Sequence, residues 1–208
     1  MRLKVCGITR LEDAIFASQL GVWALGFIFI PQSPRVVYTS RVEEIVKILN
    51  IYYPSVLKVG VFADNDEKTV RDTVSICSLD IIQFHGKESP EFTKRFSNKK
   101  IRAFIIEDRT NLTNLVENID SYDDCIPLLD LPKDRYVPFS TLIETAYKLK
   151  EIGRNFILAG GISIDNIREV ISLDPFAIDI ARGIEVIPGI KDREKLEMLV
   201  SLVKKEGR

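Results

Sequence analysis

The sequence predicts an α/β protein with a single (β/α)8 TIM-barrel domain over residues 1–208, built on eight parallel strands. Two observations favour this fold. Short apolar runs alternate with stretches of helical spacing, eight of each, and no Pro-, Ser- or Gly-rich segment divides the 208-residue chain. Units of about 26 residues would use nearly all of it, which suits the lower end of the size range of these barrels.

The strand candidates are rich in Val, Ile and Phe, and each is almost continuously apolar. This pattern is typical of strands that are buried on both faces in a parallel sheet. The eight runs are Leu3–Ile8, Ala24–Ile30, Val56–Ala63, Ile81–His85, Ile101–Ile106, Ile126–Asp130, Phe156–Ile162 and Ala177–Ala181.

The segments between these runs have the spacing of amphipathic helices. Between residues 41 and 50, an apolar stripe of Val42, Ile45, Val46 and Leu49 is separated from the charged positions. The same spacing occurs in Thr141–Ile152, Asp165–Leu173 and Asp192–Lys205. An open, doubly wound sheet is the alternative fold, but its usual Gly-rich first turn is absent after Cys6.

Composition excludes several classes of protein. Lys and Arg number 29 against 30 Asp and Glu, so the chain has no positive excess for a nucleic-acid backbone, and no nucleic-acid partner is expected. No apolar run reaches the roughly 18 residues of a membrane span. Three scattered cysteines and a start without signal-peptide features favour a cytoplasmic protein. A single His cannot build a multi-His metal centre, and we expect no metal.

Candidate site residues follow from the barrel, because active sites in this fold lie at the carboxyl-terminal ends of the strands. Cys6, His85 and Asp130 end three of the predicted strands, and Asp179 lies in the last one. The pattern alone leaves plainer interpretations open. A lone Cys is usually a small buried apolar residue, a lone His is more often structural, and Asp130 fits a solvated loop.

Glycines after the last two strands predict a phosphate site. Gly160 and Gly161 lead from a strand into a helix, and Arg182 and Gly183 follow the next strand. Glycine lets backbone N–H groups approach an anion, and a helix N-terminus adds a positive dipole end. A tight turn without a ligand is the alternative, but the loops after strands 7 and 8 are a frequent phosphate site in these barrels.

Eight segments in chain order carry a family resemblance that spans nearly the whole sequence. They are Lys4–Thr9, Gly26–Phe29 with Ser33–Arg35, Val59–Phe62, Gln83–Glu88, Leu128–Asp130, Ala159–Ile162, Asp179–Glu185 and Pro188–Asp192. Together they resemble the phosphoribosylanthranilate isomerase family. The resemblance implies the Amadori rearrangement of N-(5′-phosphoribosyl)anthranilate to 1-(2-carboxyphenylamino)-1-deoxyribulose 5-phosphate in tryptophan biosynthesis. It implies no metal or organic cofactor, and it fits either a monomer or a homodimer.

The resemblance also assigns the two catalytic roles, with Asp130 as general acid and Cys6 as general base. Opening the sugar ring requires a proton on the ring oxygen, and we expect the apolar strand end before Asp130 to raise the pKa of its carboxyl. The next step removes a proton from C2′, which a Cys6 thiolate can do if nearby positive charge or the iminium itself lowers its pKa.

Binding roles come from the same resemblance. It places Arg35 at the anthranilate end, His85 in a supporting position and Asp179 opposite the substrate. It places the phosphate on the backbone of Gly160, Gly161, Arg182 and Gly183.

Two departures from the family pattern favour a second hypothesis. The loop Leu131–Ser140 lacks the usual Gly-rich sequence, and Ala181-Arg182 stands where two serines are usual. The alternative function is therefore a catalytically weakened or inactive phosphate-binding barrel that serves as a binding or scaffold subunit. Retention of both Cys6 and Asp130 argues against it. We also hypothesise that the Arg182 guanidinium replaces a lost hydroxyl near the phosphate.

Two related barrel enzymes fit less well. The sugar isomerase of histidine biosynthesis typically uses one Asp on strand 1 and another on strand 5, where this chain has Cys6 and no Asp. Indole-glycerol-phosphate synthase needs catalytic lysines that the corresponding strand ends lack.

Overall fold

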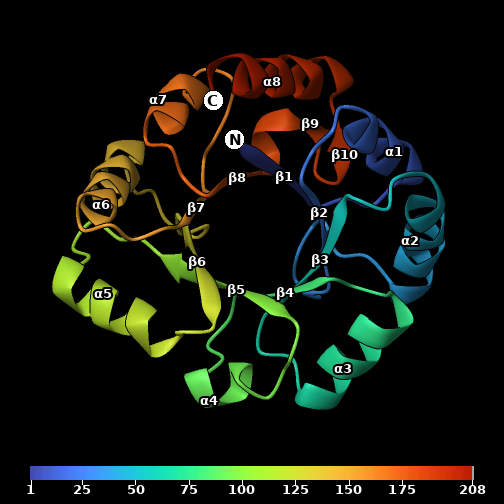
Figure 1. Ribbon diagram of the computed structural model, residues 1–208, viewed down its shortest axis with the longest axis horizontal. Coiled ribbons are helices and arrows are strands. Elements are labelled where there is room, and N and C mark those ends of the chain that lie inside the picture. Colours follow the sequence, from blue (N-terminus) through green and yellow to red (C-terminus); the bar gives the residue numbers. More distant parts are fainter. Residues whose placement is uncertain (208) are drawn as a thin grey trace.

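Eight parallel strands close into a barrel in the computed structural model of the chain, which describes residues 1–207 (Figure 1). Each strand pairs with its neighbours in sequence, and β8 pairs back to β1. This confirms the predicted barrel. The strands are β1 (Arg2–Cys6), β2 (Ala24–Ile28), β3 (Leu57–Phe62), β4 (Ile81–Phe84), β5 (Lys99–Ile105), β6 (Cys125–Asp130), β7 (Ile157–Leu158) and β8 (Ala177–Ile180).

The helices form an outer ring around the strands (Figure 1). They are α1 (Leu11–Gln19), α2 (Thr39–Tyr52), α3 (Glu67–Ile76), α4 (Pro90–Thr93), α5 (Leu112–Ser121), α6 (Phe139–Glu151), α7 (Ile167–Ser172) and α8 (Arg193–Glu206). Between β8 and α8 the chain adds a 3-10 turn, η1 (Arg182–Ile184), and an antiparallel hairpin of β9 (Glu185–Ile187) and β10 (Ile190–Lys191).

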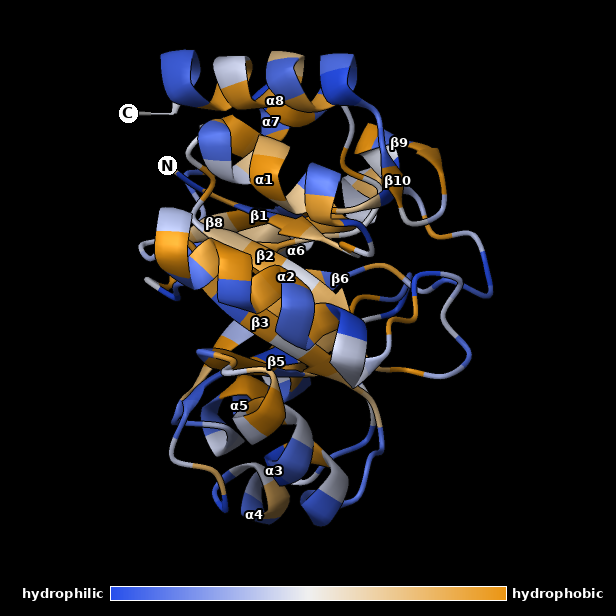
Figure 2. Cartoon of the chain, turned by 90° about the vertical axis from the view of Figure 1, so that its right-hand side faces the viewer, coloured by the Kyte–Doolittle hydropathy of each residue, from blue (hydrophilic) through white to orange (hydrophobic). Residues whose placement is uncertain are grey.

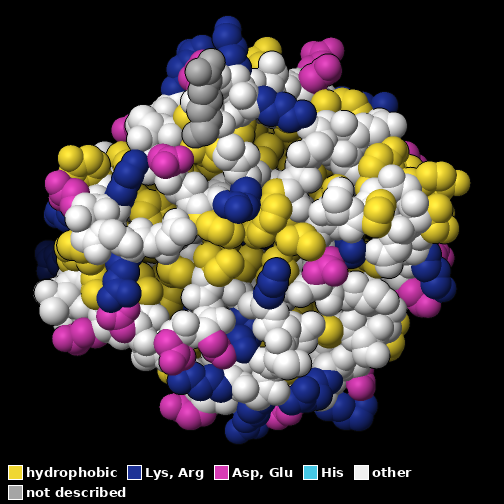
Figure 3. Space-filling model, viewed as in Figure 1, with side chains coloured by type: hydrophobic (Ala, Val, Ile, Leu, Met, Phe, Trp, Pro, Cys, Tyr) yellow, Lys and Arg dark blue, Asp and Glu magenta, His cyan; other side chains and the backbone are white. Residues whose placement is uncertain are grey.

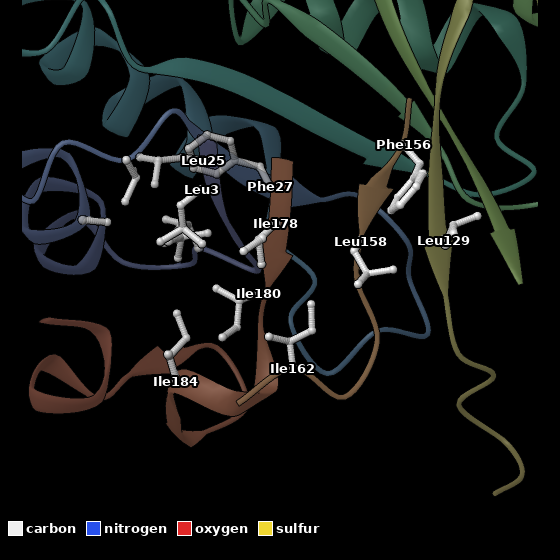
Figure 4. Close-up of a cluster of buried hydrophobic side chains, with 14 of the residues drawn as sticks. Leu3, Leu25, Phe27, Leu129, Phe156, Leu158, Ile162, Ile178, Ile180 and Ile184 are labelled. Carbon is white, nitrogen blue, oxygen red and sulfur yellow. The ribbon is translucent and has the colours of Figure 1, made fainter. Parts of the chain in front are cut away.

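Alternation of side chains along each strand creates two apolar layers. Outward-facing residues such as Leu3, Leu25 and Ile178 pack in the layer between strands and helices, part of which Figure 4 shows. The predicted stripe of α2 is buried in this layer, which confirms its amphipathic assignment. Figure 2 shows the same division on α8, whose hydrophilic residues face away from the barrel.

Inward-facing residues fill the barrel itself. A separate cluster includes Val59, Ile81 and Leu128, and it occupies the interior toward the amino-terminal ends of the strands. Trp23 and Phe176 pack against this cluster, and the Arg2 guanidinium lies 4.4 Å from the Phe176 ring centroid. Figure 3 looks onto this face, which has hydrophobic side chains at its centre. The amino-terminal end of the barrel is therefore closed by packing.

The predicted seventh strand is much shorter than its apolar run. β7 ends at Leu158 because Gly160 and Gly161 have φ values of 81° and 68°, a left-handed conformation that leaves the strand. α7 begins two residues after the predicted Asp165. Within residues 1–207, no helix has the length and apolar character needed to cross a bilayer.

Candidate active site

Polar side chains occupy the inner face of the barrel toward the carboxyl-terminal ends of its strands. Lys4 and Cys6 face inward from β1, because Leu3 and Val5 belong to the outer layer. Asp130 continues the inward series of Leu128 on β6. Gln83 and Asp179 follow inward residues of β4 and β8 in the same way. All five are buried, so this end of the barrel holds a polar cluster above an apolar floor.

Cys6 lies beside a buried ion pair. The Lys4 Nζ atom is 2.7 Å from Asp179 Oδ2, and the Lys4 side chain is fully buried. Gly26 on β2 makes room for this arrangement, since a Cβ there would lie 2.7 Å from Cys6 Sγ and 3.1 Å from Lys4 Nζ. Thiol and ammonium therefore border the same small space.

The pKa of Cys6 lies above its ordinary value in the free protein. Burial raises the pKa of the thiol, and the charge of Asp179 adds to that effect, while Lys4 and Lys191 oppose it without outweighing it. Cys6 is therefore a thiol in the free protein. The positive charge that the sequence analysis required is present, but desolvation is stronger.

Asp130 contacts His85 across the mouth of the barrel. The His85 Nε2 atom lies 3.3 Å from Asp130 Oδ2, and the backbone N–H of Leu131 donates to Asp130 Oδ1 over 2.8 Å. Burial raises the pKa of Asp130, but the hydrogen bond and charge of His85, the charge of Lys133 and the Leu131 N–H outweigh it. The pKa therefore lies below its ordinary value, and the expectation of a raised pKa was wrong because it considered only the apolar strand end.

Gln83 orients the imidazole of His85. The Gln83 Nε2 atom is 3.3 Å from His85 Nδ1, and both side chains start from the same strand face. With the amide donating to Nδ1, the imidazole proton is on Nε2 and faces Asp130. The Nε2–H of His85 thus points toward the carboxylate of Asp130.

Arg35 is anchored to the β9–β10 hairpin through Glu185. Its Nε and Nη2 atoms lie 2.9 and 2.6 Å from the two oxygens of that carboxylate, a bidentate ion pair. Lys191 Nζ donates to Glu185 over 2.9 Å and to the carbonyl oxygen of Cys6 over 2.6 Å. This network ties the hairpin to the end of β1. In Figure 2 the hairpin lies at the end of the barrel opposite the N-terminus.

The glycines predicted to bind phosphate lie where two loops meet. A Cβ on Gly183 would overlap with the carbonyl oxygen of Ile162, so the loop after β8 packs directly on the loop after β7. A Cβ on Gly160 would lie 2.6 Å from the Leu131 nitrogen, which places this glycine beside the acid as well. The Arg182 side chain is exposed, and among residues 1–207 it has no ion-pair partner.

A cavity of about 370 Å³ opens beside His85 under the unusual loop after β6. Its walls are His85, Ile105, Glu107, Leu131, Pro132, Lys133, Asp134 and Arg135. Arg135 forms an ion pair with Glu107 on the loop after β5. The loop that departs from the family pattern thus borders the acid.

Sequence reasoning missed four members of this cluster: Lys4, Gln83, Glu185 and Lys191. Two of them carried a readable signal, because Lys4 and Gln83 are polar residues inside apolar runs, two positions before Cys6 and His85. Residues two apart share one face of a strand. Glu185 and Lys191 have no such pattern, and the residues that link them to the rest of the site, Arg35 and Cys6, are distant in sequence.

The closed barrel and the buried polar cluster at its carboxyl-terminal mouth define a class of barrel protein whose active sites lie at that end. The family model for N-(5′-phosphoribosyl)anthranilate (PRA) isomerase matches residues 3–202. The chain belongs to this family.

Individual relatives agree over almost the full length. The N-(5′-phosphoribosyl)anthranilate isomerase of Geobacter metallireducens is 36% identical over 208 residues, which cover 98% of this chain and 99% of the relative. Crystal structures of phosphoribosyl anthranilate isomerase from Thermus thermophilus and Thermotoga maritima superpose with TM-scores of 0.86 and 0.88. They are 36% and 30% identical to this chain, and each comparison covers 99% of both chains.

Proposed function

We propose that this chain converts N-(5′-phosphoribosyl)anthranilate into 1-(2-carboxyphenylamino)-1-deoxyribulose 5-phosphate as an enzyme of tryptophan biosynthesis. The observation that carries the proposal is the pairing of Cys6 on β1 with Asp130 on β6 at the same end of the barrel. A solved isomerase that is 29% identical to this chain, with a TM-score of 0.84, holds a reduced form of that product. The scaffold hypothesis is not favoured, because the chain retains both reacting groups.

The reaction begins with proton donation to the ring oxygen. Asp130 gives a proton to the furanose oxygen, the C1′–O bond breaks, and the anthranilate nitrogen becomes an iminium. Since the free protein holds Asp130 as a carboxylate, the acid must be loaded before this step. Solvent is the proposed proton source, and the His85 imidazole, 3.3 Å away, orients the protonated carboxyl.

Cys6 acts in the second step as the general base. Its thiolate removes the proton from C2′, and the electron pair of that bond neutralises the iminium and gives an enolamine. The enolamine then takes a proton at C1′ and loses one from the 2′ oxygen, which forms the ketone. No proton is gained or lost overall, and the proposal requires neither a metal nor an organic cofactor.

The remaining predicted site residues would bind the ends of the substrate. Asp179 Oδ1 is buried without a hydrogen-bond partner, which suits a hydroxyl of the sugar. Arg35 would face the anthranilate carboxylate, with Glu185 fixing its guanidinium. The backbone of Gly160, Gly161 and Gly183, together with Arg182, would hold the phosphate.

Turnover of phosphoribosylanthranilate generated in situ tests the proposal, followed by the loss of its fluorescence. We expect Cys6→Ala and Asp130→Asn to lose nearly all activity while keeping the circular dichroism spectrum of the barrel. Cys77→Ala is the matched control, because Cys77 lies at the end of α3 outside the barrel and should leave turnover unchanged. An inactive natural chain would favour the scaffold hypothesis, and full activity in Cys6→Ala would remove Cys6 from the mechanism.

Growth rescue of a tryptophan auxotroph would place the activity in its pathway. For Arg182, an unchanged KM in Arg182→Ala would contradict a role in phosphate binding. A single domain over residues 1–208, a cytoplasmic location and a monomeric or homodimeric state remain predictions; the Thermotoga maritima isomerase is described as dimeric.

A further inference from the structure

We propose that Lys4 is a positioning residue for the base: its buried ammonium stabilises the thiolate of Cys6, and Asp179 holds that ammonium in place. The proposal rests on the function of Cys6 proposed above and adds a residue to which the sequence analysis gave no role in the reaction. It explains how a buried thiol can become a base.

The geometry brings the three groups together from two strands. Lys4 and Cys6 lie two residues apart on the inner face of β1, and Lys4 pairs in register with Asp179 on β8. The Lys4 Nζ to Asp179 Oδ2 distance is 2.7 Å, and the Lys4 side chain is fully buried. Both Cys6 Sγ and Lys4 Nζ border the space that the missing side chain of Gly26 leaves open.

Lys4, Asp179 and Cys6 also interact through their charges. Burial alone lowers the pKa of Lys4, but the charge and hydrogen bond of Asp179, together with those of a Cys6 thiolate, more than offset that effect, so the pKa lies above its ordinary value. Burying an ammonium group lowers the stability of the fold unless an opposite charge pairs with it. Asp179 offers only one oxygen to Lys4, since its Oδ1 has no partner. A thiolate beside Lys4 would complete the pairing.

Other charged groups also face Cys6. Lys191 from β10 lowers the pKa of Cys6 and Asp179 raises it, while Arg35 lies within electrostatic reach from the loop after β2. Lys191 is already held by Glu185 and by the Cys6 carbonyl oxygen, and Arg35 is held by Glu185. Lys4 is the cation whose ammonium borders the same space as the thiol.

The test is the pH dependence of iodoacetamide alkylation of Cys6, read by peptide mapping on the full chain without substrate. We expect Lys4→Met to raise the pKa of the thiol and to lower its alkylation rate at pH 7 about tenfold, as a shift of one unit would. Asp179→Asn should shift the thiol in the opposite direction, because it removes a negative charge. Opposite signs distinguish a charge effect from a loss of structure, which would move both variants the same way.

Lys58→Met is the matched control. Lys58 is a buried lysine on β3 that pairs with Asp80 over 2.9 Å just before β4 begins, at the other end of the barrel. It should leave the Cys6 profile unchanged. If Lys4→Met does not fold because Asp179 is left unpaired, the double variant Lys4→Met/Asp179→Asn removes both charges and should still raise the thiol pKa.

Kinetics give a second readout. In Lys4→Met the rising limb of kcat/KM against pH should move to higher pH, so that activity recovers in alkaline buffer. Identical Cys6 profiles in Lys4→Met and the natural chain, or same-sign shifts in the two single variants, would overturn the proposal. Retained turnover in Cys6→Ala would instead overturn the proposed role of Cys6, and the alkylation experiment does not depend on turnover.

Discussion

Glu185 links three parts of the barrel mouth, and Glu185→Gln tests how much that link stabilises the fold. The carboxylate receives Arg35, Lys191 and the Gly189 N–H, at distances between 2.6 and 3.1 Å. Glutamine keeps the shape but removes the charge, and it leaves Lys191, whose side chain is 0% exposed, without a counter-ion. Removing one partner of a buried pair costs about 3–5 kcal/mol. For a chain of this size that corresponds to a fall of roughly 6–20 °C in melting temperature.

Thermal unfolding followed by circular dichroism at pH 7 measures this effect. Glu67→Gln is the matched control, because Glu67 also holds two cations, Arg71 at 2.7 Å and Arg95 at 3.1 Å, but on the exposed surface of the barrel. Its loss should cost much less, because exposed ion pairs contribute little to stability. Equal losses in the two variants would refute the reasoning, since burial would then not decide the cost.

The same carboxylate predicts how this stabilisation depends on pH. Burial raises the pKa of Glu185, but the hydrogen bond from Arg35, the charge and hydrogen bond of Lys191 and the Gly189 N–H outweigh it. The pKa is therefore lower in the folded chain than in the unfolded one. The contribution is complete above the unfolded value of about 4.3 and is lost as the pH falls through the folded value. The gap between natural and Glu185→Gln chains should close on acidification.

Two further predictions concern the phosphate loops and the acid. Gly183→Ala should push the loop off the Ile162 carbonyl oxygen and raise KM by about tenfold or more. Gly153→Ala, which meets no atom within 4 Å but has a φ of 75°, should cost stability and leave KM unchanged; equal KM values would remove Gly183 from the binding site. His85→Asn should raise the folded pKa of Asp130, so unfolding free energies of the two chains should diverge as pH rises through about 2 to 5. Parallel stability curves would show that His85 does not act on the carboxyl.

Much of the fold could be predicted because each strand of the barrel is a short apolar run of the sequence. The apolar runs located every strand of the barrel, and the stripe of α2 identified its buried face. The end of β7 was not predictable from hydropathy, since the apolar residues continue past Leu158. It is the left-handed conformation of Gly160 and Gly161 that ends the strand.

The candidate site was predictable in its positions but not in its protonation. The strand-end rule brought Cys6, His85 and Asp130 to one end of the barrel, where the structure also places them. Both pKa directions depended on neighbours from other strands. Asp130 is governed by His85 on β4, and Cys6 is governed by its burial against β2 and β8. Such contacts cross large sequence separations that single-strand patterns do not encode.

The pairing of β1 with β8 has a consequence for the order of folding. The Lys4–Asp179 contact joins residues separated by 175 positions, so it forms only when the last strand closes the ring. Contacts of such long range form late, because the loop that they close is costly in entropy. During synthesis, β1 emerges first, and Lys4 has no counter-ion until Asp179 on β8 has been made. The base therefore gains its electrostatic environment at closure, and a chain released before its eighth strand would have a cysteine but no active centre.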